Sequence, residues 1–141
     1  MILHESTQAD MKARNRKGGH NERAMSRVLL TTIYQFWEDR YRGLFASEIG
    51  SKKDEVTSDF FGDIRYIRNA IVHHRNVATV EVNKCKVLKL FTPGDAIHLT
   101  ADQVRFVVRG VRLALDEICQ RYLGVDGGFA SRHGLAGHQR A

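Results

Sequence analysis

Six consecutive residues, Arg68 to His73, include three side chains suited to phosphate chemistry: Arg68, Asn69 and His73. An arginine guanidinium is a permanent cation that can donate two hydrogen bonds to phosphate oxygens, and an imidazole can take up or release a proton near neutral pH. The amide of Asn69 can donate and accept hydrogen bonds beside them. Such a set can hold and cleave a phosphodiester without a metal ion.

The residues around this motif predict the helix that positions it. Apolar residues recur there at helical spacing: Phe60, Ile64, Ile67 and Ile71. We expect a helix that starts near Thr57 or Ser58 and stops near His74. Two similar spacings, Arg14 to His20 and Arg132 to His138, run through glycines that disfavour a helix by about 1 kcal/mol each. The pair at 68 and 73 is therefore the one with a rigid support.

The motif helix has two faces. At about 100° per residue, Arg65, Asn69 and His73 share the side opposite the apolar stripe. Arg68 lies about 140° around the helix from His73, so a single phosphate is awkwardly placed to touch both on one helix. A second copy of the helix would bring an arginine and a histidine together.

The sequence Arg68-Asn69-x3-His73 resembles the motif of HEPN domains, all-α modules found in many toxins and defence ribonucleases, and the resemblance extends over roughly residues 24–123. It implies an all-α, HEPN-like bundle of roughly four to five helices with a short extended connector before the last helix. It also implies a homodimer paired through the motif helices that cuts RNA by attack of the ribose 2′-hydroxyl, without a metal or cofactor. In such a site Arg68 binds the scissile phosphate, His73 acts as acid or base, and Asn69 helps to orient them.

The resemblance carries two further expectations. An acidic or polar residue on a preceding helix often steadies the arginine of the motif, and Glu38, or else Asp39, is expected in that role. One branch of the family has a tyrosine two positions after the histidine, where a nucleotidyltransferase partner modifies it. This chain has Arg75 there, which argues against that modification but leaves an antitoxin or another partner protein open.

Other interpretations of the same residues stay open. The last carbonyls of a helix favour basic side chains by about 0.3–1 kcal/mol, which accounts for His74 and Arg75 and allows the motif to be an ordinary solvated face. A HEPN-like fold without catalysis would be a binding module for RNA or a nucleotide, or a subunit of a larger complex. A metal site is not expected, because the adjacent His73 and His74 lack i, i+4 spacing with a third ligand.

Composition limits the class of protein. The 141 residues suit one domain. A net charge of +6 and a pI of about 9.6 favour a polyanionic partner such as RNA. Because no apolar run approaches the roughly 18 residues that span a bilayer, and the first residues lack the pattern of a secretion signal, we expect a cytoplasmic protein. Cys85 and Cys119 have no metal-ligand or disulfide spacing and are expected to be reduced thiols.

The chain divides into three predicted regions: a flexible basic arm at 1–20, which has room for a short helix before Gly18-Gly19, a helical domain at 21–124 and a Gly-rich disordered tail at 125–141. Within the domain, Met25 to about Ala46 is expected to be a long amphipathic helix, capped by Asn21 or Ser26.

The segment between the motif helix and the last helix is harder to interpret. Residues 80–91 suit a helix or a strand, and we predict a helix. Thr92-Pro93-Gly94-Asp95 fits a type II turn, and residues 96–99 then form the extended connector.

The last helix has the clearest pattern. Thr100 and Gln103 form a predicted capping box and Gly124 a stop. Between them runs an apolar seam that we expect to be buried: Val104, Val108, Val111, Leu115, Ile118 and Tyr122. Beside the seam, Arg105, Arg109 and Arg112 form a basic stripe. Together with Arg65, this stripe would add phosphate contacts if it borders the motif, and is otherwise a solvated face.

Overall fold

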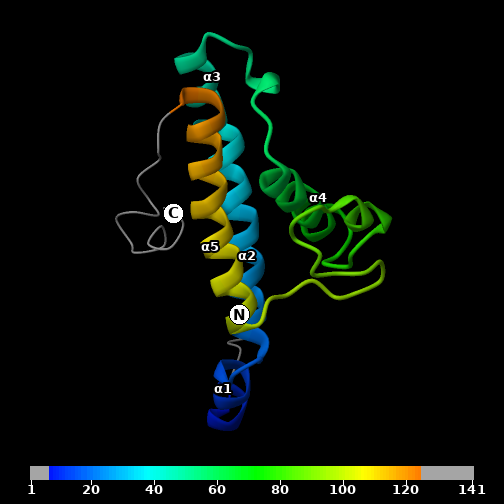
Figure 1. Ribbon diagram of the computed structural model, residues 1–141. Coiled ribbons are helices and arrows are strands. Elements are labelled where there is room, and N and C mark those ends of the chain that lie inside the picture. The colour runs from blue at the N-terminus through cyan, green and yellow to red at the C-terminus, as the bar shows by residue number, and fades with distance from the viewer. Residues whose placement is uncertain (1–6, 125–141) are drawn as a thin grey trace, which may run out of the picture.

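The computed structural model describes residues 7–124, which form an all-α fold without a strand in that range. Its α-helices are α1 (Gln8–Asn15), α2 (His20–Phe36), α3 (Arg42–Ile49), α4 (Asp59–His73) and α5 (Ala101–Ile118). Figure 1 shows α2 and α5 side by side and running in the same direction, with α4 beside them and α1 projecting from one end. The predicted all-α class is confirmed.

One helix runs from residue 20 to residue 49, because α2 continues through a π-helical turn (Trp37–Tyr41) into α3. This confirms the long helix predicted from Met25 to Ala46. The predicted cap is wrong, since the helix begins at His20 behind Gly19. Ser26 is instead buried inside the helix, where its Oγ accepts a hydrogen bond from the Leu99 backbone N–H at 2.9 Å. That bond ties the connector to α2.

Capping residues set the ends of α4 and α5 as predicted. The Ser58 hydroxyl accepts from the Phe61 N–H at 3.4 Å, and His74 is the C-cap of α4. Thr100 and Gln103 form the capping box of α5. The α5 helix continues as a π-helical turn (Cys119–Leu123) that stops at Gly124, whose φ of 66° is left-handed. Glycine reaches that conformation without the strain a Cβ would bring.

The predicted helix at 80–91 is wrong, and Asp63 explains why. Only a short 3-10 helix forms there, Val80–Lys84. After it, the backbone N–H groups of Lys86, Val87 and Leu88 all donate to the buried Asp63 carboxylate, at 3.0, 2.6 and 2.8 Å. Because those N–H groups point at one side chain, they are not available for a helical ladder.

The turn and the extended connector that follow are confirmed. Gly94 has a φ of 95°, and Asp95 N–H donates to Thr92 O at 3.1 Å, as the predicted turn requires. An isolated antiparallel bridge joins Val77 to Ala96. The connector therefore lies along the residues that follow α4.

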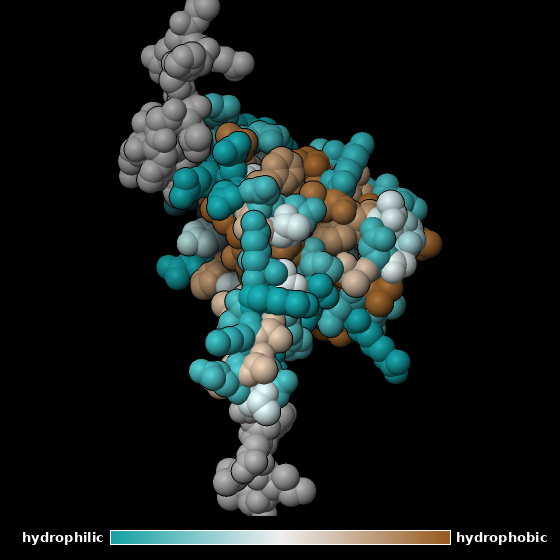
Figure 2. Space-filling model, turned by 90° about the horizontal axis from the view of Figure 1, so that it is seen from below, coloured by the Kyte–Doolittle hydropathy of each residue, from teal (hydrophilic) through white to brown (hydrophobic). Residues whose placement is uncertain are grey.

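The core lies between α2, α4 and α5, but α5 does not bury the whole seam that the sequence predicts. The fully covered residues of α5 are Val107, Ala114 and Ile118, whereas Val108 is 37% exposed. Val104, Val111, Leu115 and Tyr122 are only partly buried against the core. In the view of Figure 2, apolar surface is exposed in patches among hydrophilic side chains. The seam thus faces both the core and an open surface.

No helix within residues 7–124 is long and apolar enough to cross a membrane. In the expected N-terminal arm, α1 begins behind a capping box made by Thr7 and Asp10, and it ends before Gly18. Residues 1–6 and 125–141 lie outside the described range, and the expected Gly-rich tail falls there.

Candidate nucleic-acid site on helix α4

Helix α4 presents the motif on its last two turns, and its own core contacts hold it in place. Phe60, Ile64 and Ile67 are buried, as the apolar stripe predicts. At the start of the helix, the Tyr122 hydroxyl accepts from the Thr57 N–H at 3.0 Å. One turn into the helix, the Asp63 carboxylate accepts hydrogen bonds from the backbone of the segment after Lys84. The motif therefore stands on a helix that is anchored at its start and along its length.

Arg68 is held by two neighbours. Its Nη1 donates to the Asn69 Oδ1 at 3.3 Å, and its Cζ lies 5.6 Å from the centroid of the Tyr34 ring on α2. A cation over an aromatic face is stabilised by about 0.5–2 kcal/mol, more when it is desolvated. Arg68 is half-buried and makes no ion pair with another described residue. The guanidinium is thus positioned without being neutralised.

Tyr34 is the residue that sequence reasoning missed. It lies beside the core rather than in it, so the apolar stripe of the long helix does not select it. Burial raises its pKa above the ordinary value, with a further rise from the Glu38 carboxylate. The phenol therefore stays protonated at neutral pH. A tyrosine one turn before Glu38 was the available signal, but only the structure reveals that α4 places Arg68 over it.

Glu38, expected to steady Arg68, makes its ion pairs elsewhere. Its carboxylate contacts Arg42 Nη1 and Lys53 Nζ, each at 3.1 Å. Burial alone would raise the pKa of Glu38, but the hydrogen bonds from Lys53 and Arg42 outweigh it and lower the pKa. Arg42 in turn donates to the Val56 carbonyl at 2.8 Å. Glu38 thus links the π-helical turn to the segment that leads into α4, and the second choice, Asp39, is exposed on that turn.

His73 is the last residue of α4 and is exposed, as are His74 and Arg75 after it. Within residues 7–124, neither a hydrogen bond nor an ion pair joins Arg68 to His73. Their spacing of five residues separates them by about 140° around the helix, as predicted. Arg65 is exposed on the same side as Asn69 and His73, with its Cζ 5.5 Å from the Tyr66 ring centroid. One chain therefore presents Arg65, Asn69 and His73 on a single polar face, with Arg68 between that face and the core.

The basic stripe of α5 lies on a different side of the molecule from this face. Gly110 of α5 meets the Phe60 ring of α4, and Phe60 is about 180° around α4 from Asn69. Arg105 pairs with Asp102 at 2.6 Å, Arg109 borders a hollow beside Phe60, and Arg112 lines a groove between α2 and α5. The stripe does not border the motif within one chain.

Among residues 7–124, no group of three or more His, Cys, Asp or Glu side chains is placed to hold a metal ion. Both cysteines are free thiols. Burial raises the pKa of Cys85 to about 11, so its thiolate is scarce at neutral pH. Comparison of the chain with protein-family models, curated proteins and solved structures found no match.

Proposed function

We propose that this chain is a metal-independent endoribonuclease of HEPN type, acting as a toxin or defence effector on RNA. The observation that carries the proposal is the environment of Arg68, an un-neutralised guanidinium held between the Tyr34 ring and the Asn69 amide. A guanidinium that is already in position can stabilise the negative charge that develops on the phosphate oxygens in the transition state. An exposed imidazole ends the same helix.

The reaction balances with these groups alone. His73 of one subunit removes the proton of a ribose 2′-hydroxyl, whose oxygen attacks the adjacent phosphorus. His73 of the partner subunit protonates the 5′-oxygen as the P–O5′ bond breaks. Arg68 donates hydrogen bonds to the phosphate oxygens while negative charge builds up on them. The products are a 2′,3′-cyclic phosphate and a 5′-hydroxyl.

Two copies are needed because Arg68 and His73 of one chain point about 140° apart. We propose pairing through the outer face of α4. Val72, 50% exposed, lies between Arg68 and Asn69 around the helix and supplies apolar contact at an otherwise polar interface. Arg65 would extend the phosphate contacts from the cut site toward the start of α4.

A second candidate function is a module that binds RNA or a nucleotide without cutting it, alone or within a larger complex. The observation that favours it is the pairing of Glu38 with Arg42 and Lys53, which leaves Arg68 without an acidic residue to orient it among residues 7–124. Fold alone does not decide between cutting and binding.

Cleavage of a labelled RNA pool in EDTA tests the proposal. The native chain is compared with Arg68→Ala, His73→Ala and the matched control His74→Ala, which removes the neighbouring exposed imidazole. We expect the first two changes to reduce cutting by at least about 100-fold and the control by less than about threefold. Binding without cleavage by the native chain would favour the second candidate instead.

A further inference from the structure

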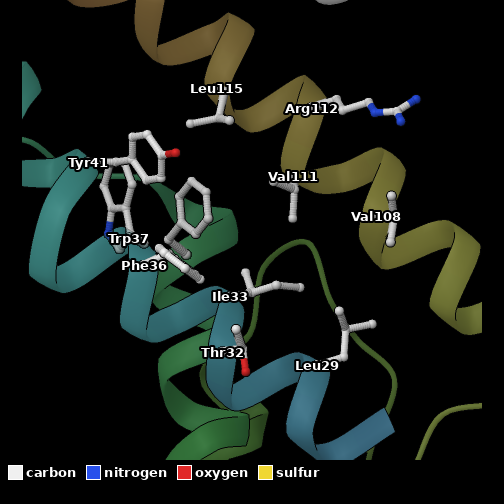
Figure 3. Close-up of a pocket in the computed structure, with 11 residues that line it drawn as sticks. Leu29, Thr32, Ile33, Phe36, Trp37, Tyr41, Val108, Val111, Arg112 and Leu115 are labelled. Carbon is white, nitrogen blue, oxygen red and sulfur yellow. The ribbon is translucent and has the colours of Figure 1, made fainter. Parts of the chain in front are cut away.

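A groove between α2 and α5 is an apolar feature of the described surface that the proposed function leaves unused. It has a volume of about 430 Å³, and Figure 3 shows its two walls. One wall has Leu29, Ile33 and Phe36 of α2, the other has Val108, Val111 and Leu115 of α5, and Trp37 and Tyr41 lie at one end. Phe61, whose ring stacks on that of Trp37 with 4.2 Å between the centroids, also lines the groove. We call this the α2/α5 groove.

Large apolar side chains of the groove are exposed to solvent. Phe36 is 55% exposed, Tyr41 42% and Val108 37%. This is where the predicted seam of α5 is left half covered. Contiguous exposed apolar surface of this kind marks an interaction site in a folded protein.

The shape of the groove fits a helix. The wall formed by α2 and the π-helical turn after it runs from Leu29 to Tyr41, which is about 18 Å at the 1.5 Å rise of a helix. A third helix of about 12 residues would fill it and cover both walls. Recognition of this kind uses apolar anchors spaced at i, i+3, i+4 and i+7.

Charge selects the kind of helix. Arg112 is the one charged residue among the 11 that line the groove, and it forms no ion pair with another described residue. An acidic side chain beside the apolar stripe of the occupant would complement it. A second copy of this chain fits less well, because each copy carries a net charge of +6 and its exposed faces on α4 and α5 are basic.

We propose that the α2/α5 groove binds an acidic amphipathic helix of a partner protein. The groove is separate from the motif, since Arg68, Asn69 and His73 are not among the residues that line it. Docking therefore leaves Arg68 and His73 free for RNA, and the proposal does not depend on cleavage.

A synthetic peptide tests the groove directly. The probe is a helical peptide of about 18 residues, free of tryptophan, with a leucine stripe flanked by glutamates, and its twin carries lysines in place of the glutamates. Trp37, the single tryptophan of the chain, lines the groove, so its fluorescence reports occupancy. We expect the acidic peptide to bind the full chain at least about tenfold more tightly than the basic twin.

Three variants locate the binding. Val108→Glu should weaken the acidic peptide by at least about tenfold, because it places a charge among the apolar anchors. Arg112→Glu should reverse the preference between the two peptides. The control Arg109→Glu makes the same charge change on α5 beside a different hollow, and should alter the affinity by less than about twofold. Tyr41→Glu, on the α2 side, replaces Val108→Glu if that variant fails to fold.

Three results would overturn the proposal. One is equal binding, or no binding, of the two peptides by the native chain. Another is acidic-peptide binding that both groove variants leave unchanged. The third is a native dimer that Val108→Glu converts to monomer and that the acidic peptide does not displace, because the occupant would then be a second copy.

Discussion

The guanidinium of Arg68 on α4 lies over the phenol ring of Tyr34 on α2, with 5.6 Å between the Arg68 Cζ and the ring centroid. Because α2 is part of the continuous helix from residue 20 to residue 49, this contact fixes the cation relative to the core. In the proposed reaction, this contact and the Asn69 amide would hold Arg68 in position for a phosphate.

Two substitutions of Tyr34 distinguish the contribution of its aromatic ring from that of its hydroxyl group. Tyr34→Phe keeps the aromatic face, so RNA cleavage should stay within about twofold of the native rate. Tyr34→Leu removes the face and should lower kcat/KM by about tenfold, equivalent to about 1.4 kcal/mol. Equal losses in both variants, at unchanged melting temperature, would assign the effect to the hydroxyl and contradict this account of Arg68.

Asp63 should be among the side chains most important for stability. Asp63→Ala leaves the N–H groups of Lys86, Val87 and Leu88 without their acceptor, and we expect the free energy of unfolding to fall by about 3–5 kcal/mol. The control is Asp59→Ala, one turn earlier, whose carboxylate forms an exposed ion pair with Lys86 and should cost less than about 1 kcal/mol. Urea unfolding measures both, and similar losses would contradict the account.

Glu38 should make stability depend on pH. Its pKa is lower in the folded state than its ordinary value, so its contribution is present above that ordinary value and is lost as pH falls through the folded pKa. The difference in unfolding free energy between the native chain and Glu38→Gln should therefore shrink between about pH 6 and about pH 3. A difference that stays constant over this range would show that the Arg42 and Lys53 pairs do not stabilise the fold.

Two glycines in helices should respond oppositely to alanine. A Cβ at Gly110 would meet the buried Phe60 ring, 3.0 Å from its Cζ, so Gly110→Ala should lose about 1–2 kcal/mol despite better helix propensity. A Cβ at Gly62 has open space around it, and Gly62→Ala should gain about 0.5–1 kcal/mol. Stabilisation by Gly110→Ala would contradict the close packing of α4 on α5.

Local signals in the sequence predict most helix ends correctly, as Ser58, Thr100 and Gly124 illustrate. Prediction from the sequence fails where the local structure depends on a residue that is distant in the chain. The 80–91 segment has a helical pattern, but the Asp63 carboxylate captures its N–H groups. Periodicity likewise places Val108 on the seam without revealing that α2 leaves it half covered.

The candidate site also has residues that local spacing places correctly and residues whose roles depend on tertiary packing. Helical spacing alone places Arg65, Asn69 and His73 on one face, because that relationship is local. Tyr34 could not be chosen from spacing, since its role comes from the packing of α2 against α4. Glu38 was chosen for its charge and its place on the preceding helix, but Lys53, on a later segment, competes for its carboxylate.

We propose that the chain cuts RNA by attack of a 2′-hydroxyl at a site built from Arg68 and His73. The most direct test maps a cut site in an RNA treated in EDTA, then compares that RNA with one carrying a single 2′-deoxyribose on the 5′ side of the scissile phosphate. The account predicts 2′,3′-cyclic phosphate ends on the first RNA and no cutting at that position in the second. Cutting of the deoxy-substituted position, or ends bearing a 5′-phosphate, would contradict it.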